Sequence, residues 1–99
     1  MKSITHMVIF CLKHGKHSLQ EKEFISDSIE ILSSIPVVRD FRAYRQTSPK
    51  NGFDFGFTMK FKDKNSYEEY NKHPSHLEYV NNRWLNEVDN FLEIDFEEI

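Results

Sequence analysis

The sequence predicts an α+β domain whose elements follow in the order strand, helix, strand, strand, helix, strand. Three observations carry this prediction. The N-terminal segment alternates side chains along two largely apolar faces, and Phe or Met occupies every second position of residues 53–61. Two stretches between the strands have helical spacing of apolar residues. The chain has 99 residues, which is room for one such domain, spanning residues 1–99.

Composition excludes several classes of function. The formal net charge of -3 leaves no basic surface for nucleic acid, and we interpret Lys50, Lys60, Lys62 and Lys64 as solvated side chains. The single cysteine, Cys11, excludes an internal disulfide framework and a cysteine-based zinc site. No apolar run approaches the ~18 residues of a membrane span, and no signal-peptide pattern is visible. We therefore expect a cytoplasmic protein with neither a nucleic-acid nor a membrane partner.

Residues 3–13 have the pattern of a strand that is covered on both sides, because both of its faces are mostly apolar. A polar loop over residues 14–17 follows. Ser18 and Glu21 then have the spacing of a capping box, which predicts the start of a helix. Helical spacing of apolar residues continues to Ile35–Pro36, where the proline ends the helix.

The remaining elements are two strands joined by a turn, a broken helix and a terminal strand. Residues 37–47 and 53–62 flank a turn cluster at 48–52, which predicts a hairpin. Residues 63–72 predict a short helix that is broken at His73–Pro74. A second helical piece starts at Ser75, and its predicted buried stripe is Leu77, Val80, Trp84 and Val88. The terminal strand alternates Leu92, Ile94 and Phe96 with acidic residues.

This order is the ferredoxin-like βαββαβ arrangement, a four-stranded antiparallel sheet with both helices on one face. The row of phenylalanines in residues 53–61 is the natural lining of the helix-covered face. On the other face, Met7, Ile9 and Cys11 of the first strand have nothing in this chain to cover them. A second copy packed sheet to sheet would do so, and we therefore expect a homodimer.

The segment from Tyr70 to His76 is the most specific candidate for chemistry. Pro74 stands between two histidines and favours a fresh helix start, which places His76 in a first turn. The positive end of a helix lowers the proton affinity of an imidazole. His6 projects from the first strand onto the helix-covered face. His73, His76 and His6 could ligate a metal, but no carboxylate or cysteine completes the set, so we expect none.

The sequence resembles the stress-responsive dimeric α/β-barrel (Dabb) domain family over nearly its full length. The resemblance rests on the opening ITHMVIFCLK, the HPSH segment and the closing FLEIDFEE. The strand-one histidine of the family matches His6, and its Y-x-x-HP-x-H pattern matches Tyr70, His73, Pro74 and His76. The resemblance implies a ferredoxin-like subunit that dimerises into a barrel.

One family member, a plant polyketide cyclase, performs an aldol condensation in a pocket between sheet and helices. The resemblance implies His76 as a general base, Tyr70 as the group that holds or protonates an enolate, and His6 as a further pocket residue. A third-strand histidine of the cyclase falls at Phe55 here, which makes this pocket more apolar. The residues that we expect to bind substrate are Phe24, Phe55, Phe57, Met59, His73 and Trp84.

Other interpretations stay open. His76 can cap its own helix start, Tyr70 can simply pack, and His6 can be a buried, hydrogen-bonded imidazole. The protein is then either an enzyme that applies acid–base lyase or cyclase chemistry to a small apolar carbonyl compound without a cofactor, or a non-catalytic stress-protective or ligand-binding dimer. Trp84 also invites comparison with haem-degrading or cofactor-free monooxygenases of similar fold, but no other motif supports that.

Overall fold

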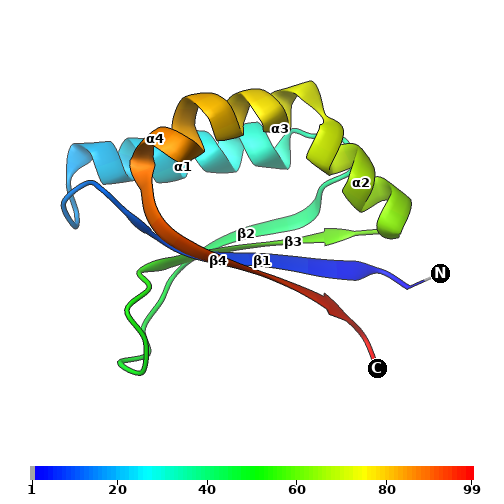
Figure 1. The fold of residues 1–99 in the computed structure, drawn as a ribbon, viewed down its shortest axis with the longest axis horizontal. Helices are drawn as coiled ribbons and strands as arrows, with labels where there is room; N and C mark the ends of the chain where they lie inside the picture. The colour runs from blue at the N-terminus through cyan, green and yellow to red at the C-terminus, as the bar shows by residue number, and fades with distance from the viewer. Residues whose placement is uncertain (1) are drawn as a thin grey trace.

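The computed structural model describes residues 2–99 and has the predicted order of elements. Four strands form one antiparallel sheet in the order β2-β3-β1-β4, and the helices all lie on one of its faces (Figure 1). The α+β ferredoxin-like prediction is confirmed. No helix within residues 2–99 is long and apolar enough to cross a membrane.

The strands are β1 (Ile4–Leu12), β2 (Arg39–Arg45), β3 (Phe55–Phe61) and β4 (Val88–Glu97). The helices are α1 (Leu19–Ser33), α2 (Lys64–Lys72), α3 (Pro74–Tyr79), the π-helical turn η1 (Val80–Trp84) and α4 (Leu85–Glu87).

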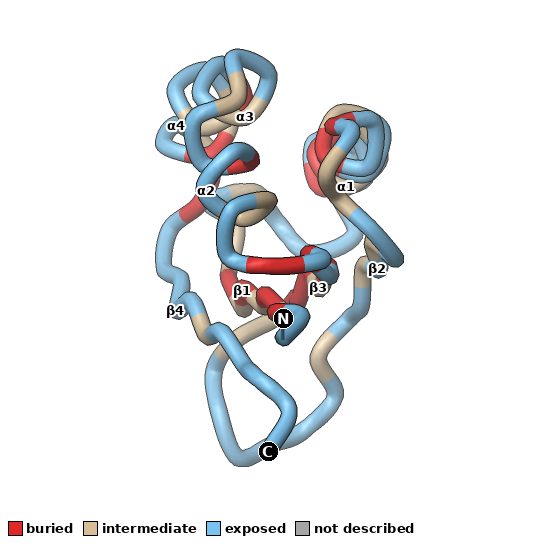
Figure 2. Tube along the Cα trace, turned by 90° about the vertical axis from the view of Figure 1, so that its right-hand side faces the viewer, coloured by how far each residue is buried: buried red, intermediate tan, exposed pale blue. Residues whose placement is uncertain are grey.

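The core lies between the helices and one face of the two central strands, where the buried segments of the chain concentrate (Figure 2). Antiparallel pairing sets His6 opposite Met59 and Phe10 opposite Phe55, so the apolar rows of β1 and β3 share this face. Burial of aromatic side chains is the main stabilising term of so small a domain. The residues that are almost fully buried there are Phe10, Phe24, Phe57, Phe61, Ile35, Met59 and Ser28.

Helix α1 begins with the predicted capping box. The Ser18 hydroxyl accepts the backbone N–H of Glu21, and the Glu21 carboxylate accepts the backbone N–H of His17. Arg45 of β2 donates to the same carboxylate at 2.9 Å. Glu21 is buried, so these partners provide the hydrogen bonds that its charge needs.

The predicted buried stripe of the second helical region is wrong at Leu77, which is 48% exposed, and Tyr79 is buried in its place. The turn η1 explains the difference, because a π-turn inserts an extra residue and rotates the faces that follow it. Tyr79 and Trp84, five residues apart, therefore both reach the core. Val88 is buried as predicted, but as the first residue of β4 rather than as part of a helix.

The face of the sheet that the helices leave open is strongly apolar. The register of β4 against β1 sets Leu92 opposite Ile9 and Ile94 opposite Met7. Antiparallel partners share a face, so the apolar positions of β4 join those of β1 on the open side. Within residues 2–99, no other segment covers this face. The open sheet face comprises Met7, Ile9, Cys11, Tyr44, Leu92, Ile94 and Phe96.

Candidate functional site

The break between α2 and α3 brings Tyr70 and His76 together. His73 ends α2 in an extended conformation, and its Nδ1 accepts the backbone N–H of Ser75 at 3.1 Å. Pro74 is the first residue of α3, where its missing N–H costs nothing. His76 follows in the first turn, and its ring centre lies 4.2 Å from that of Tyr70.

His76 carries a buried nitrogen without a partner. Its Nδ1 is shielded from solvent and makes no hydrogen bond within the described chain. Removal from water lowers the pKa of the imidazole below its usual 6.5, with a smaller opposing effect from the Asn71 backbone. The ring is therefore neutral at pH 7, and one of its nitrogens is available to a ligand.

A second polar group lies close to this pair, where β1, β4 and α2 meet. The buried His6 donates from Nδ1 to Asp95 at 2.6 Å, and the Tyr67 hydroxyl donates to the same carboxylate at 2.9 Å. Asp95 thereby fixes the proton of His6 on Nδ1 and leaves Nε2 as an acceptor. The ring centre of His6 lies 6.3 Å from that of Tyr70.

His76 also lines a cavity of about 230 Å³ that lies between the sheet and the α3–η1–α4 segment. Its walls are almost entirely apolar or aromatic. The Tyr79 hydroxyl, one of its few polar groups, is engaged with Ser28 at 2.6 Å. The lining residues are Val8, Leu32, Phe57, Met59, His76, Tyr79, Val80, Trp84, Leu85, Phe91 and Glu93.

Of the residues expected to bind substrate, Phe57, Met59 and Trp84 line this cavity together with His76. The others do not. Phe24 is fully buried and packs against Phe10, Tyr79 and Trp84 in the core, and His73 caps α3. Tyr70 and His6 lie behind His76 rather than on the cavity wall.

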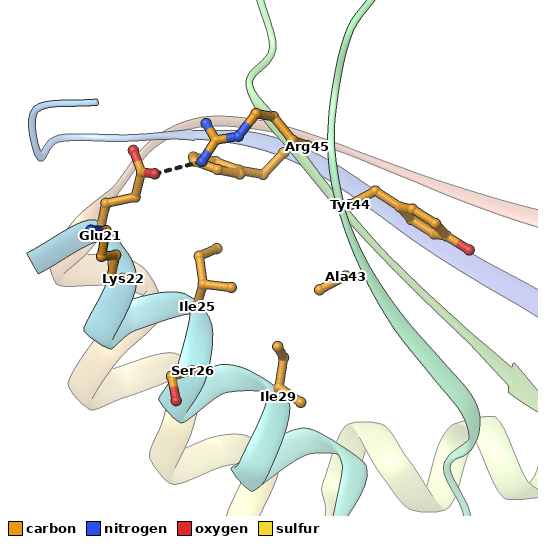
Figure 3. A pocket seen from close by; sticks show the side chains of 9 residues that line it. Glu21, Lys22, Ile25, Ser26, Ile29, Ala43, Tyr44 and Arg45 are labelled. Carbon is orange, nitrogen blue, oxygen red and sulfur yellow. Dashed lines mark hydrogen bonds and ion pairs between the residues drawn. The ribbon is translucent and has the colours of Figure 1, made fainter. Parts of the chain in front are cut away.

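Phe55 lies elsewhere, at a larger groove of about 370 Å³ between α1 and β2 (Figure 3). This groove has Ile25, Ile29 and Ala43 on its walls and the Arg45–Glu21 ion pair at one end. Of its charged groups, Glu21 and Arg45 are paired with each other and Lys22 is exposed, and no histidine is among the described residues that line it. The smaller cavity is therefore the better candidate for chemistry.

Asp95, Tyr67 and Glu93 are the site residues that sequence reasoning missed. The alternation of β4 makes it a strand, but only the register against β1 shows that Asp95 lies opposite His6. Tyr67 lies one turn before Tyr70 on α2, and this spacing indicates that the two side chains share one face of the helix. Within residues 2–99, no three His, Cys, Asp or Glu side chains come together as a metal-binding group.

Comparison with known proteins settles the family. A family model described as the stress responsive A/B barrel domain (Dabb) matches residues 4–98. The chain belongs to this family. No curated protein matches it. A Dabb family protein from Mesorhizobium loti with a ferredoxin-like fold is 47% identical, with a TM-score of 0.99 over 100% of this chain and 99% of that one.

Two more distant structures of similar fold extend the comparison. A protein of unknown function from Bacteroides fragilis, described as dimeric and ferredoxin-like, is 18% identical, with a TM-score of 0.68 over 97% of this chain and 96% of that one. A hydroxynitrile lyase from Passiflora edulis is 14% identical, with a TM-score of 0.85 over 99% of this chain and 94% of that one. At these identities the likeness shows the fold alone.

Proposed function

We propose that this Dabb protein binds a small apolar carbonyl compound in the 230 Å³ cavity and moves a proton on it by acid–base chemistry, without a cofactor. The observation that carries the proposal is the unpartnered Nδ1 of His76, held against Tyr70 at the wall of an apolar cavity. A buried nitrogen without a hydrogen bond destabilises the fold, so such a group in a native structure needs an explanation, and a ligand that bonds to it would supply one.

In the proposed step, neutral His76 accepts a proton from the carbon next to the carbonyl. The electron pair of the broken C–H bond forms the new C=C bond, and the carbonyl π electrons move onto oxygen. Burial raises the pKa of Tyr70 far above its usual 10.0, so its hydroxyl keeps its proton at neutral pH. Tyr70 lies behind His76, so the carbonyl end of the ligand must pass His76 to reach the Tyr70 hydroxyl, which then donates a hydrogen bond to the enolate oxygen.

His6 has a supporting part in this proposal. Asp95 and Tyr67 hold the ring, which lies behind His76 and not on the cavity wall. In this proposal its Nε2 accepts a hydrogen bond only from a ligand whose carbonyl end has passed His76. A partner that orients a histidine in this way restricts it to one tautomer and one direction. We assign Asp95 as a positioning residue for this reason.

We also propose that the protein is a homodimer and, as its composition suggests, cytoplasmic. The apolar open sheet face supports the dimer, and some structural relatives are described as dimeric ferredoxin-like proteins. A second copy would cover Leu92 and Phe96, each 49% exposed in the single chain.

Exchange of α-protons for deuterium tests the proposed chemistry. The probe is phenylacetone in D2O with the intact protein, followed by loss of the α-proton NMR signals. We expect catalysed exchange, and we expect His76→Ala and Tyr70→Phe each to slow it by roughly 10²–10⁴. His17→Asn is the matched control, because it removes a histidine from an exposed loop where Asn tolerates the positive φ of 63°.

Thermal melts of all variants verify that they fold. If wild-type protein does not accelerate exchange beyond the His76→Ala variant, catalysis is contradicted. Binding of phenylacetone without exchange would instead support the ligand-binding alternative.

A further inference from the structure

We propose that the cavity selects ligands whose end nearest β4 is a cation or a neutral hydrogen-bond donor, and that it rejects carboxylates and phosphates. The inference rests on the proposed function, because it names the substrate class of the same cavity. It follows from the charge of the residues that line the cavity, from the aromatic rings among them, and from the face of the sheet on which Glu93 of β4 lies.

Glu93 is the one charged residue among those that line the cavity. The register sets it opposite Val8, which places its side chain on the helix-covered face of the sheet, and it is exposed at the cavity rim. Asp95 follows two positions along the same face, so a second carboxylate lies close by. No lysine or arginine is among the described residues that line the cavity. An anionic ligand would therefore meet like charge and no compensating cation.

The negative charge of Glu93 also acts on two tyrosines behind the cavity wall. Burial is the main reason that the pKa values of Tyr67 and Tyr70 are raised, and the negative charge of Glu93 adds to both shifts. The other polar side chains of the lining do not offset this charge. His76 is neutral at pH 7, and the Tyr79 hydroxyl is engaged with Ser28.

Aromatic rings surround the space next to this carboxylate. Trp84 and Phe91 meet edge to face with their ring centres 5.5 Å apart, and Phe57 and Tyr79 complete the wall. Faces of aromatic rings attract cations and repel anions through the quadrupole of the ring. Four rings and one carboxylate therefore favour a small ammonium or hydroxyl compound with an apolar body.

Three ligands with a common phenyl body test this selectivity: 2-phenylethylamine, 2-phenylethanol and 3-phenylpropionate. Trp84 is the only tryptophan of the chain and lines the cavity, so its fluorescence reports binding directly. We expect the amine and the alcohol to give saturable changes, and we expect the carboxylate to bind at least about tenfold more weakly than the amine.

Glu93→Gln separates charge from shape. The variant should bring the affinities for amine and carboxylate close together and leave that for the alcohol unchanged. Glu30→Gln is the matched control, because it removes one charge from an exposed position of α1 that does not line the cavity. It should retain the wild-type preference.

The outcomes distinguish this inference from the proposed function. If the carboxylate binds as tightly as the amine, or if Glu93→Gln keeps the preference, the selectivity is overturned while the cavity remains a binding site. If none of the three ligands changes Trp84 fluorescence, both the inference and the proposed binding cavity are overturned.

Discussion

At the residue scale, the two histidines of the site differ in what their nitrogens contact. His6 has Nδ1 engaged by a carboxylate 2.6 Å away, whereas His76 has a buried Nδ1 with no partner in the described chain. The Asp95 carboxylate and the Tyr67 hydroxyl restrain the His6 ring. Desolvation keeps the second ring neutral. This difference makes His76 the base and His6 a fixed acceptor in the proposed chemistry.

The pH dependence of proton exchange follows from these environments. The base acts when neutral, and the pKa of His76 is lowered from 6.5, so the rate should be constant around pH 7 and fall only in acid below about pH 6.5. The pKa of Tyr70 is raised from 10.0, so the alkaline limb should lie above that pH. A pH–rate profile of phenylacetone exchange checks both limbs. A midpoint between pH 7 and 9 would contradict the assignment of His76.

At the element scale, an ion-pair network joins three parts of the chain. Arg83 of η1 donates to Asp27 of α1 at 2.7 Å and to Glu87 of α4 at 2.5 Å. Glu87 also accepts from His14, in the loop before α1, at 2.8 Å. The network holds η1 against α1 and thereby fixes the wall that carries Trp84.

Glu87 should make the stability depend on pH. Burial raises its pKa, but hydrogen bonds from Arg83 and His14 outweigh burial and hold the pKa below its usual 4.5. A carboxyl whose pKa is lowered on folding stabilises the protein above its unfolded pKa, and this stability is lost as pH falls through the folded value. Glu87→Gln should lower the free energy of unfolding at pH 7 by about 1.5–3 kcal/mol.

The same variant should also lose stability less steeply than wild type below about pH 4.5, because the group that titrates is gone. Chemical denaturation at several pH values measures both effects, with Glu30→Gln as the control at an exposed position. Parallel pH curves for wild type and Glu87→Gln would show that the carboxylate carries no such linkage.

The elements show which parts of the fold and site local sequence can predict. The capping box at Ser18, the phenylalanine row of β3 and the proline break at Pro74 are local patterns, and each appears in the structure where the spacing puts it. The π-turn η1 is not local in this sense. It brings both Tyr79 and Trp84 into the core, so the helical stripe through Leu77 was wrong.

The site was predictable only where the motif is contiguous. Tyr70 and His76 lie in one short segment, and the structure brings them into contact. Asp95 is 89 residues from His6 in sequence, and their contact arises from the register of β4 on β1, which spacing alone does not fix. Glu93 reaches the cavity through the same register.

At the scale of the whole molecule, the elements of residues 2–99 cover the sheet on one side only. Its open face is apolar across β1 and β4 and has a notch of about 190 Å³ over Gly56, between Ile9 and Tyr44. An isologous partner would cover this surface with a copy of itself and could fill the notch. A stable interface buries roughly 800 Å² on each partner, which is within the reach of a sheet of this size.

We therefore expect sedimentation velocity at micromolar concentration to give twice the mass of one chain. Ile94→Asp should shift the protein toward monomer, because Ile94 lies on the open sheet face opposite Met7 and the change buries an uncompensated charge in each copy. Leu77→Asp is the matched control: this leucine is 48% exposed on α3, on the helix side of the sheet, and its variant should remain dimeric.

Circular dichroism of both variants separates dissociation from unfolding. If Ile94→Asp unfolds, the melting temperature of wild type still decides, because a dimer that dissociates on unfolding melts at a higher temperature as protein concentration rises. A wild-type chain that sediments as a monomer, with a melting temperature independent of concentration, would leave the apolar sheet face in water. That result would contradict the proposed homodimer.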